Sequence, residues 1–104
     1  MRAPPPADAD TFLATTELVA ALDGGLAPLE AGLLAALHLG LAADSRSFAR
    51  VFGVAHALVL RAVETLAGEE LLAVTERDPR TQRTRYAPGL QGAPLLARLP
   101  RATA

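Results

Sequence analysis

Cysteine, lysine, asparagine, isoleucine and tryptophan are absent from this chain of 104 residues, and aromatic residues make up only 4% of it. Without cysteine there is no disulfide framework, no thiolate metal site and no cysteine nucleophile, which fits a reducing cytoplasm. The shortage of aromatic residues means that leucine, alanine and valine must build most of the core. A chain of this length forms one domain with a modest core.

The residue patterns that support catalysis are also missing. His38 and His56 belong to different predicted helices, and neither has a second histidine or a carboxylate at metal-ligand spacing. Glu69 and Glu70 are adjacent, so we expect their side chains to point apart. Gly24-Gly25 follows a predicted helix and is typical of a helix stop. We therefore expect no enzyme activity, no metal and no cofactor.

No membrane or export segment is expected either. The chain lacks the basic start and long apolar run of a signal peptide, and the apolar run over 31–43 is too short to cross a bilayer. We expect a cytoplasmic protein with an extended or disordered arm over 1–9, because the arm contains Pro4-Pro5-Pro6. The folded domain is then expected over 10–99 and a tail over 100–104.

Positive charge is confined to one half of the chain. The net charge is −1, which alone argues against a generally basic nucleic-acid binder. The residues through Asp44 carry a balance of −5, however, and those from Ser45 onward carry +4, with nine of the ten arginines. This asymmetry is typical of a one-sided electrostatic surface for DNA, although a solvated arginine face on an ordinary domain is the alternative.

The first predicted helix begins at Asp8 or Asp10 and ends near Leu22, before two glycines. A short final helix is expected over 92–99. Their apolar residues exceed what one packing face requires, so we expect a homodimer, with simple burial against the next helix as the alternative. The expected dimer residues are Phe12, Leu13, Leu18, Val19, Leu22, Leu95, Leu96 and Leu99.

Three helices are predicted between these two. One begins at Pro28, whose fixed φ suits the first helical position. The next is capped by Asp44 and ends at Gly53, where a tight turn between helices needs a positive φ. The third covers about 55–67, because Val59, Val63 and Leu66 recur at helical spacing.

A hairpin is predicted after these helices. The short, partly β-branched stretch 71–75 and the run 83–86 can pair as strands, and Asp78-Pro79 between them has turn chemistry. Helix, turn, helix and hairpin together predict a mainly α fold with a small β-hairpin wing over about 71–88, which is a winged helix-turn-helix.

At these residues the chain resembles the MarR family of winged-helix transcription regulators. The pattern Phe48-Ala49-x-x-Phe52-Gly53-Val54 is similar to the family signature L-A-x-x-L-G-V, and Asp78-x-Arg80-x-x-Arg83 is similar to its wing motif D-x-R-x-x-R. Tyr86-x-Pro88-Gly89-x-x-Gly92 stands where the family has Y-x-L-T-x-x-G. The chain departs from the family at Ala55, where a cap residue is usual, and at Glu70, where glycine is usual and Gly68 is expected to stop the helix instead.

The resemblance implies a DNA-binding transcriptional regulator, with repression as the expected sense, that binds duplex DNA as a homodimer. The helix over 55–67 would read the major groove and the wing would meet the minor groove, with Asp78 holding the wing, Arg83 probing the groove, and Arg80 bracing the loop or meeting phosphate. A small-molecule effector is not identified by any residue. The expected DNA-binding residues are Ser45, Arg46, His56, Ala57, Leu58, Leu60, Arg61, Arg80, Arg83 and Arg85.

The alternative function is a protein-interaction or structural module. Leu58 and Leu60 favour it, because large apolar groups cannot hydrogen-bond base edges. The family's two long C-terminal helices have no counterpart before Ala104, so a dimer interface is expected to be different or smaller.

Overall fold

The computed structural model describes residues 9–100, and within them it has five helices and one two-stranded antiparallel sheet. The elements are α1 (Ala9–Leu22), α2 (Pro28–His38), α3 (Ser45–Phe52), α4 (His56–Gly68), β1 (Leu72–Arg77), β2 (Thr84–Pro88) and α5 (Gly92–Leu96). The prediction of a mainly α fold with a small hairpin is confirmed at this level, and the arrangement is compatible with a winged helix. Ala9, expected in the arm, begins α1, and the remaining predictions for 1–8 and 101–104 lie outside the described residues.

The predicted helix boundaries are confirmed where a residue has a local reason to start or stop a helix. Pro28 is the first residue of α2, and Glu30 accepts a hydrogen bond from the Ala27 N–H at 2.9 Å. Asp44 caps α3 by accepting from the Ser47 N–H at 2.8 Å. Gly53 turns the chain between α3 and α4 with φ of +66°.

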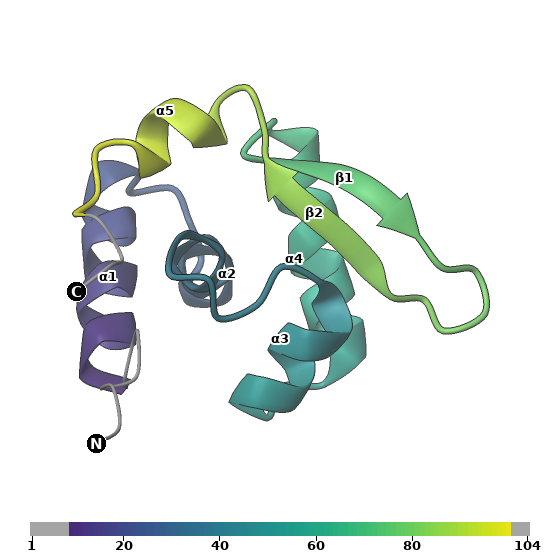
Figure 1. Ribbon diagram of the computed structural model, residues 1–104. Coiled ribbons are helices and arrows are strands. Elements are labelled where there is room, and N and C mark those ends of the chain that lie inside the picture. The colour runs from purple at the N-terminus through teal and green to yellow at the C-terminus, as the bar shows by residue number, and fades with distance from the viewer. Residues whose placement is uncertain (1–8, 101–104) are drawn as a thin grey trace, which may run out of the picture.

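The core is organised around α2, which Figure 1 shows end-on between α1 on one side and α3 with α4 on the other. All residues from Ala31 to Ala36 are buried, so this helix has neighbours on nearly every side. Three phenylalanines fill the space beside it, with the Phe12 and Phe48 rings each 4.5 Å from the Phe52 ring. Few aromatic residues are present, and most of them are concentrated at this one contact.

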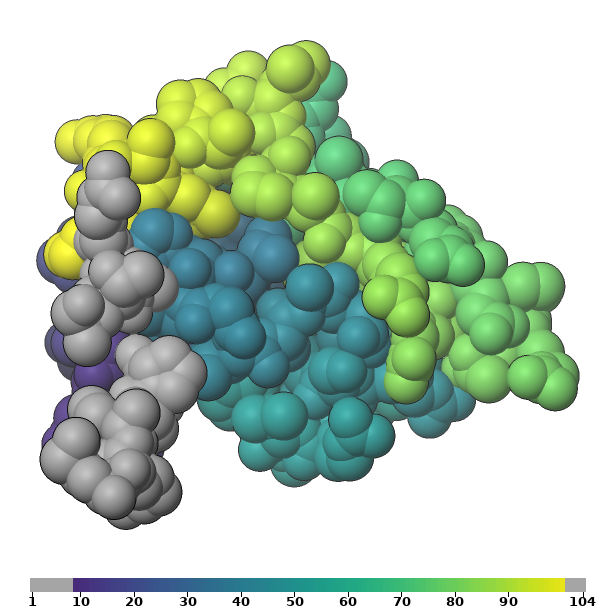
Figure 2. Space-filling model, in the orientation of Figure 1, coloured from purple at the N-terminus to yellow at the C-terminus, as the bar shows by residue number. Residues whose placement is uncertain are grey.

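The hairpin projects from the helical body, as the space-filling view also shows (Figure 2). Its strands pair with a register shift between Val74 and Glu76. The segment before α3 lies along the free edge of β2, because the Tyr86 N–H donates to the Ala43 carbonyl oxygen at 3.1 Å and Asp44 forms a bridge with Arg85. The hairpin is therefore joined to the start of α3.

At its base the hairpin meets the loop that follows α4. Helix α4 ends at Gly68 as predicted, but the positive φ that turns the chain is at Glu70, at +62°, so a glutamate takes the conformation that glycine usually supplies. Gly89 and Gly92 pack directly on this loop. A Cβ at either position would overlap a backbone carbonyl oxygen, that of Glu70 or that of Leu71 respectively. The two glycines are thus required by close approach of backbone to backbone.

The expected dimer residues are mostly inside the domain. Val19, Leu96 and Leu99 belong to the buried core, so their assignment to a dimer interface is wrong. The final helix ends at Leu96, shorter than predicted, and it folds onto the body. Phe12, Leu22 and Leu95 are partly buried against the same core. Of this set only Leu13 and Leu18 are largely exposed, at 57% and 43%.

Candidate nucleic-acid interface

The exposed face of α4 is centred on Arg61. Val59, Val63 and Leu66 turn into the core at helical spacing, which leaves the opposite side of the helix to solvent. The Arg61 side chain has no hydrogen bond or ion pair with any residue of 9–100. An arginine that is free in this way can donate to a guanine edge or a phosphate without first breaking another contact.

The other exposed residues of this face offer few directional groups. Ala57 carries none, and Leu58 is apolar and 50% exposed. Thr65 donates its hydroxyl hydrogen to the Arg61 carbonyl oxygen at 3.2 Å, within the same helix. Leu60, expected to be exposed like Leu58, is half-buried. The face therefore has one cationic hydrogen-bond donor, beside Thr65, the paired Glu64 and small or apolar side chains.

Two residues expected to contact DNA are instead part of an internal joint. Ser45 is fully buried, and its Oγ accepts the Thr84 N–H at 2.9 Å while lying 2.8 Å from His56 Nε2. The prediction of a DNA contact by the Ser45 side chain is wrong for this reason. His56, expected on the reading face, is partly buried and directed at Ser45. This joint connects α3, α4 and β2.

The surroundings of His56 favour its neutral form. Ser45 Oγ already accepts the Thr84 N–H, so a neutral imidazole whose Nε2 accepts the Ser45 hydroxyl hydrogen would satisfy both groups. Burial and the nearby Arg46 charge lower the pKa of His56, and the Asp44 charge opposes this only in part. A neutral histidine is therefore the form that the joint favours.

Asp44 connects the joint to the hairpin arginines. Its Oδ1 lies 3.4 Å from Arg83 Nε, and Arg83 is only 38% exposed. Burial alone would raise the pKa of Asp44, but hydrogen bonds from the Ser47 N–H and hydroxyl, together with the Arg83 charge, outweigh it and lower the pKa. Arg83, which the family pattern assigns to the groove, is thus already paired inside the protein.

The hairpin loop is shaped by Asp78. Its Oδ1 accepts from the Arg80 and Thr81 N–H groups at 2.9 and 3.3 Å, and these bonds lower the pKa of Asp78. The Gln82 N–H donates to the Asp78 carbonyl oxygen at 2.8 Å, and Gln82 takes a positive φ of 64°. Asp78 therefore shapes the turn through both its carboxylate and its backbone carbonyl.

Arg46 holds this loop from the side of α3. Its Nε and Nη2 donate to the Thr81 carbonyl oxygen at 3.1 and 2.6 Å. Sequence reasoning placed Arg46 at DNA but missed this contact, because the two residues are far apart in the chain and their pairing has no local signature. The loop is consequently fixed against the body rather than free.

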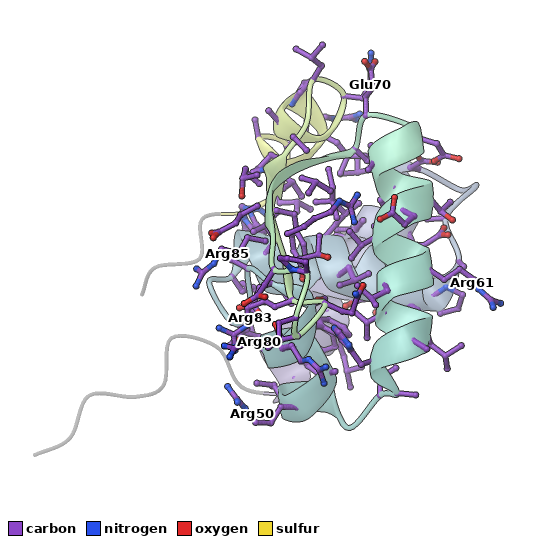
Figure 3. All side chains as sticks on the ribbon, turned by 90° about the vertical axis from the view of Figure 1, so that its right-hand side faces the viewer. Arg50, Arg61, Glu70, Arg80, Arg83 and Arg85 are labelled. Carbon is purple, nitrogen blue, oxygen red and sulfur yellow. The ribbon has the colours of Figure 1, made fainter. Side chains whose placement is uncertain are left out.

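The remaining arginines of this half differ in whether they are paired. Arg77 pairs with Glu64 of α4 at 2.6 Å, and Arg85 pairs with its cross-strand neighbour Glu76 at 3.3 Å. The Arg80 side chain has no partner within 9–100. Figure 3 shows Arg80, Arg83 and Arg85 on one side of α4, and Arg61 projecting from the other. The cations thus flank the helix.

Buried polar groups near this surface are almost all satisfied. The exception among the described residues is the Tyr86 hydroxyl, which is buried without a hydrogen-bond partner. Burial raises the pKa of Tyr86 well above its ordinary value, and the Asp44 charge adds to the effect. The phenol therefore stays protonated and contributes no charge to the interface.

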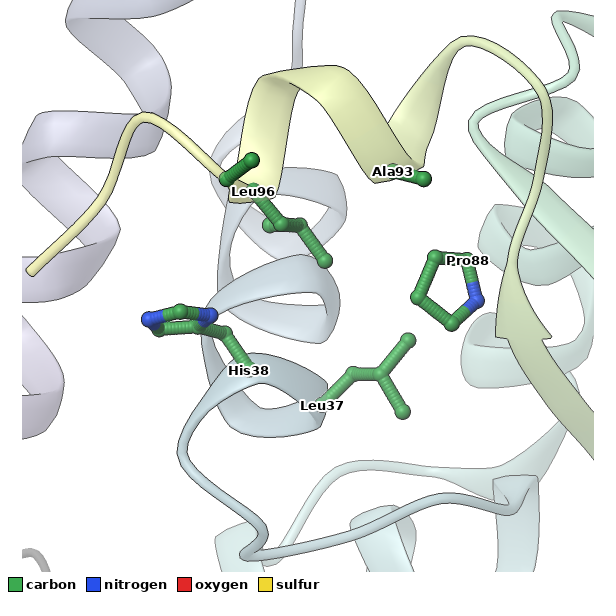
Figure 4. A pocket seen from close by; sticks show the side chains of 6 residues that line it. Leu37, His38, Pro88, Ala93 and Leu96 are labelled. Carbon is green, nitrogen blue, oxygen red and sulfur yellow. The ribbon is translucent and has the colours of Figure 1, made fainter. Parts of the chain in front are cut away.

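A hollow of about 390 Å³ lies away from this surface, between α2, the end of β2 and α5 (Figure 4). Its lining is apolar except for His38, whose Nε2–H donates to the Pro100 carbonyl oxygen at 2.6 Å. No group of three histidine, aspartate or glutamate side chains suited to a metal is found in 9–100, and no helix there could span a membrane.

A comparison of the chain with protein-family models, with curated proteins and with solved structures finds no match. The functional argument therefore rests on the geometry of the chain itself.

Proposed function

We propose that the chain is a winged helix-turn-helix module that binds duplex DNA and regulates transcription, with repression as the expected sense. Helix α4 would enter the major groove, and the hairpin would act as the wing at the minor groove. The single observation that carries this proposal is the unpartnered Arg61 at the centre of the exposed face of α4. The unpaired Arg80 at the hairpin loop supports it.

The roles of the wing residues follow from their pairing. Arg83 is engaged with Asp44, so we assign the wing's contact with DNA beside the minor groove to Arg80, which no residue of 9–100 holds. Narrow minor grooves have enhanced negative potential that attracts an arginine. Asp78 keeps the loop in shape through its two N–H contacts. The proposal thus keeps the structural role of Asp78. Arg80 takes the DNA contact that the family pattern gives to Arg83, and Arg83 braces the hairpin through Asp44.

Readout of base sequence would be sparse. Arg61 is suited to the two acceptors of guanine, and Leu58 to a neighbouring thymine methyl group. With only one directional donor on α4, discrimination should depend strongly on DNA shape.

The test is a gel shift with genomic DNA fragments at two salt concentrations. Arg61→Ala should weaken binding to the best fragment by about 1–3 kcal/mol, as expected for loss of a bidentate guanine contact. Thermal stability should change little, because the side chain makes no hydrogen bond or ion pair with another residue of 9–100. Arg98→Ala is the matched control, since Arg98 is exposed and also unpaired but lies beyond α5. Equal binding of the Arg61→Ala variant to every fragment would remove the basis of the proposal.

A homodimer is part of this proposal, with α1 as the contact. Leu13 and Leu18 are the exposed leucines of this helix. A two-fold dimer on DNA would place its two α4 helices about 34 Å apart, one turn of the duplex. Sedimentation equilibrium should show a mass of two chains that Leu13→Glu with Leu18→Glu reduces to one. A parent protein that sediments as a single chain would contradict it.

Protein interaction is the second candidate function. Its support is the exposure of Val51 and Leu58, at 56% and 50%, which places two large apolar side chains on adjacent helices. In the gel shift this candidate predicts no retarded band at either salt concentration.

A further inference from the structure

An open hollow of about 520 Å³ lies between the start of α3 and the hairpin loop. Its lining comes from two elements that are far apart in the sequence, and it is dominated by guanidinium groups. The lining residues are Arg46, Asp78, Arg80, Thr81 and Arg83. Three cations around one hollow repel each other unless an anion or water separates them, so the site suits a negatively charged group.

Arg46 is held in one orientation at this hollow. Two of its nitrogens, Nε and Nη2, donate to the Thr81 carbonyl oxygen. A guanidinium has five N–H donors, so those on Nη1 and the second on Nη2 remain without an acceptor among residues 9–100. Because the planar group is already fixed, an anion that binds to its free edge loses less side-chain entropy than it would with a mobile arginine.

Asp78 and Asp44 offset two of the three positive charges, which leaves the hollow with a formal charge of +1. Asp78 directs Oδ1 to the Arg80 and Thr81 N–H groups, inside the turn. Asp44 is buried and faces Ser47 and Arg83. Neither carboxylate pairs with the Arg46 or Arg80 side chain. Two guanidinium groups therefore remain available to a ligand, and phosphate oxygens are the acceptors that match their geometry best.

We propose that this hollow binds one phosphate group, held by the free edge of Arg46 and by Arg80, with Arg83 forming the third wall. The proposal rests on the proposed function, because it assigns the group to the DNA backbone beside the groove that the hairpin meets. The same chemistry occurs in free inorganic phosphate and in phosphate monoesters. Since Arg46 also grips the Thr81 carbonyl oxygen, a bound phosphate would hold the loop against α3.

The DNA arm of the test measures how affinity for a mixed-sequence duplex falls with salt. Arg46→Gln with Arg80→Gln should lower the slope of log affinity against log salt by about one unit, which is the expected loss of one neutralised phosphate. Arg98→Gln removes an exposed, unpaired charge away from the hollow and should leave the slope unchanged. Arg80→Gln alone provides a variant with little structural risk, because the Arg80 side chain makes no hydrogen bond or ion pair with any described residue.

The phosphate arm uses the full chain labelled with ¹⁵N and titrated with inorganic phosphate against chloride at equal ionic strength. Phosphate should shift the Arg46 Nε–Hε signal and the backbone signals of Thr81 and Gln82, and the double variant should lose the backbone shifts. Such shifts in a parent protein that binds no DNA would support the site, identify free phosphate as its source and refute only the proposed function.

The reverse pattern refutes the phosphate site alone. If the parent binds DNA, the double variant keeps the parent's salt slope, and phosphate produces no shift beyond that of chloride, the hollow is a solvated arginine cluster. Shifts that persist in the double variant would also overturn the site. A lower slope without shifts from inorganic phosphate would support a backbone phosphate as the ligand.

Discussion

The two ends of the hairpin are held in place by different interactions. At the base, backbone packs on backbone: the Gly89 N–H donates to the Leu71 carbonyl oxygen at 3.1 Å, and the Gln91 N–H donates to that of Glu70 at 2.8 Å. At the loop end, side chains make the contacts, through Asp78 within the turn and Arg46 from α3. The base is held by close backbone packing that leaves no room for a side chain, whereas the loop end is held by hydrogen bonds of polar side chains.

This difference separates folding from binding. A backbone contact cannot be retuned by exchanging one side chain for another, so the base defines where the strands begin. The loop end can change its charge while the strands remain paired, and the unpaired Arg80 is found there. We therefore expect substitutions at the base to affect stability most, and substitutions at the loop to affect mainly interactions with other molecules.

The largest effect should come from Gly92→Ala. The added methyl group would overlap the Leu71 carbonyl oxygen, which is backbone and cannot rotate away. We expect a loss of at least about 3 kcal/mol in the free energy of unfolding, measured by urea denaturation.

Gly68→Ala is its control. Nothing lies within 4 Å of a Cβ at Gly68, the last residue of α4, so alanine should stabilise the protein by about 0.4–1 kcal/mol through the entropy of the unfolded chain. If the Gly92→Ala and Gly68→Ala variants have the same free energy of unfolding, close backbone packing at Gly92 does not stabilise the base of the hairpin.

A smaller loss is expected for Ser45→Ala, which acts on the joint next to the loop. The change leaves the buried Thr84 N–H without its acceptor and should cost about 1–3 kcal/mol. Thr65→Ala removes a hydroxyl that bonds only within α4, so it should cause no loss. A Ser45→Ala variant as stable as the parent would mean that water or another group replaces the hydroxyl.

The smallest effect concerns the pH dependence of that joint. The pKa of His56 is lowered from 6.5 in the folded protein, so the unfolded chain takes up a proton first as the pH falls. Stability should therefore be complete above pH 6.5 and decline as the pH falls through 6.5 towards the folded-state pKa. Asp44 and Asp78, whose pKa values are lowered from 3.8, act in a separate and more acidic range.

Thermal denaturation at a series of pH values measures this effect. His56→Gln should remove the part of the pH dependence that lies just below pH 6.5, and His38→Gln is the control with the other histidine. An unchanged pH profile in the His56→Gln variant would show that the joint tolerates the imidazolium.

Residues that act on their own neighbours were predictable from the sequence. Pro28, Asp44 and Gly53 each start or stop a helix through local backbone chemistry, and the structure has all three in these roles. The positive φ of Glu70 has no cause in the residue itself: its loop packs on Gly89 and Gly92, and the only sequence signal was that the family pattern has glycine there.

Residues that act on distant partners were predicted less well. The burial of Ser45 depends on Thr84, and the pairing of Arg83 depends on Asp44, so neither could be read from a local pattern. Leu96 and Leu99 show the same limit for apolar residues. Helical spacing predicts that one face of a helix is apolar, but not whether the same chain or a second subunit packs on that face. The sequence therefore identified the arginines of the candidate site, but it did not show which of them are paired with other residues.

The burial of Leu96 and Leu99 also affects when the chain can fold during its synthesis. These two leucines are made after every other core residue of 9–100, yet they cover a core that begins with Val19 in α1. A ribosome-bound chain that has just completed α4 lacks these two leucines and the strand that satisfies Ser45. Folding should therefore wait until Leu99 has left the exit tunnel, and the helices would emerge with part of their apolar surface open to chaperones.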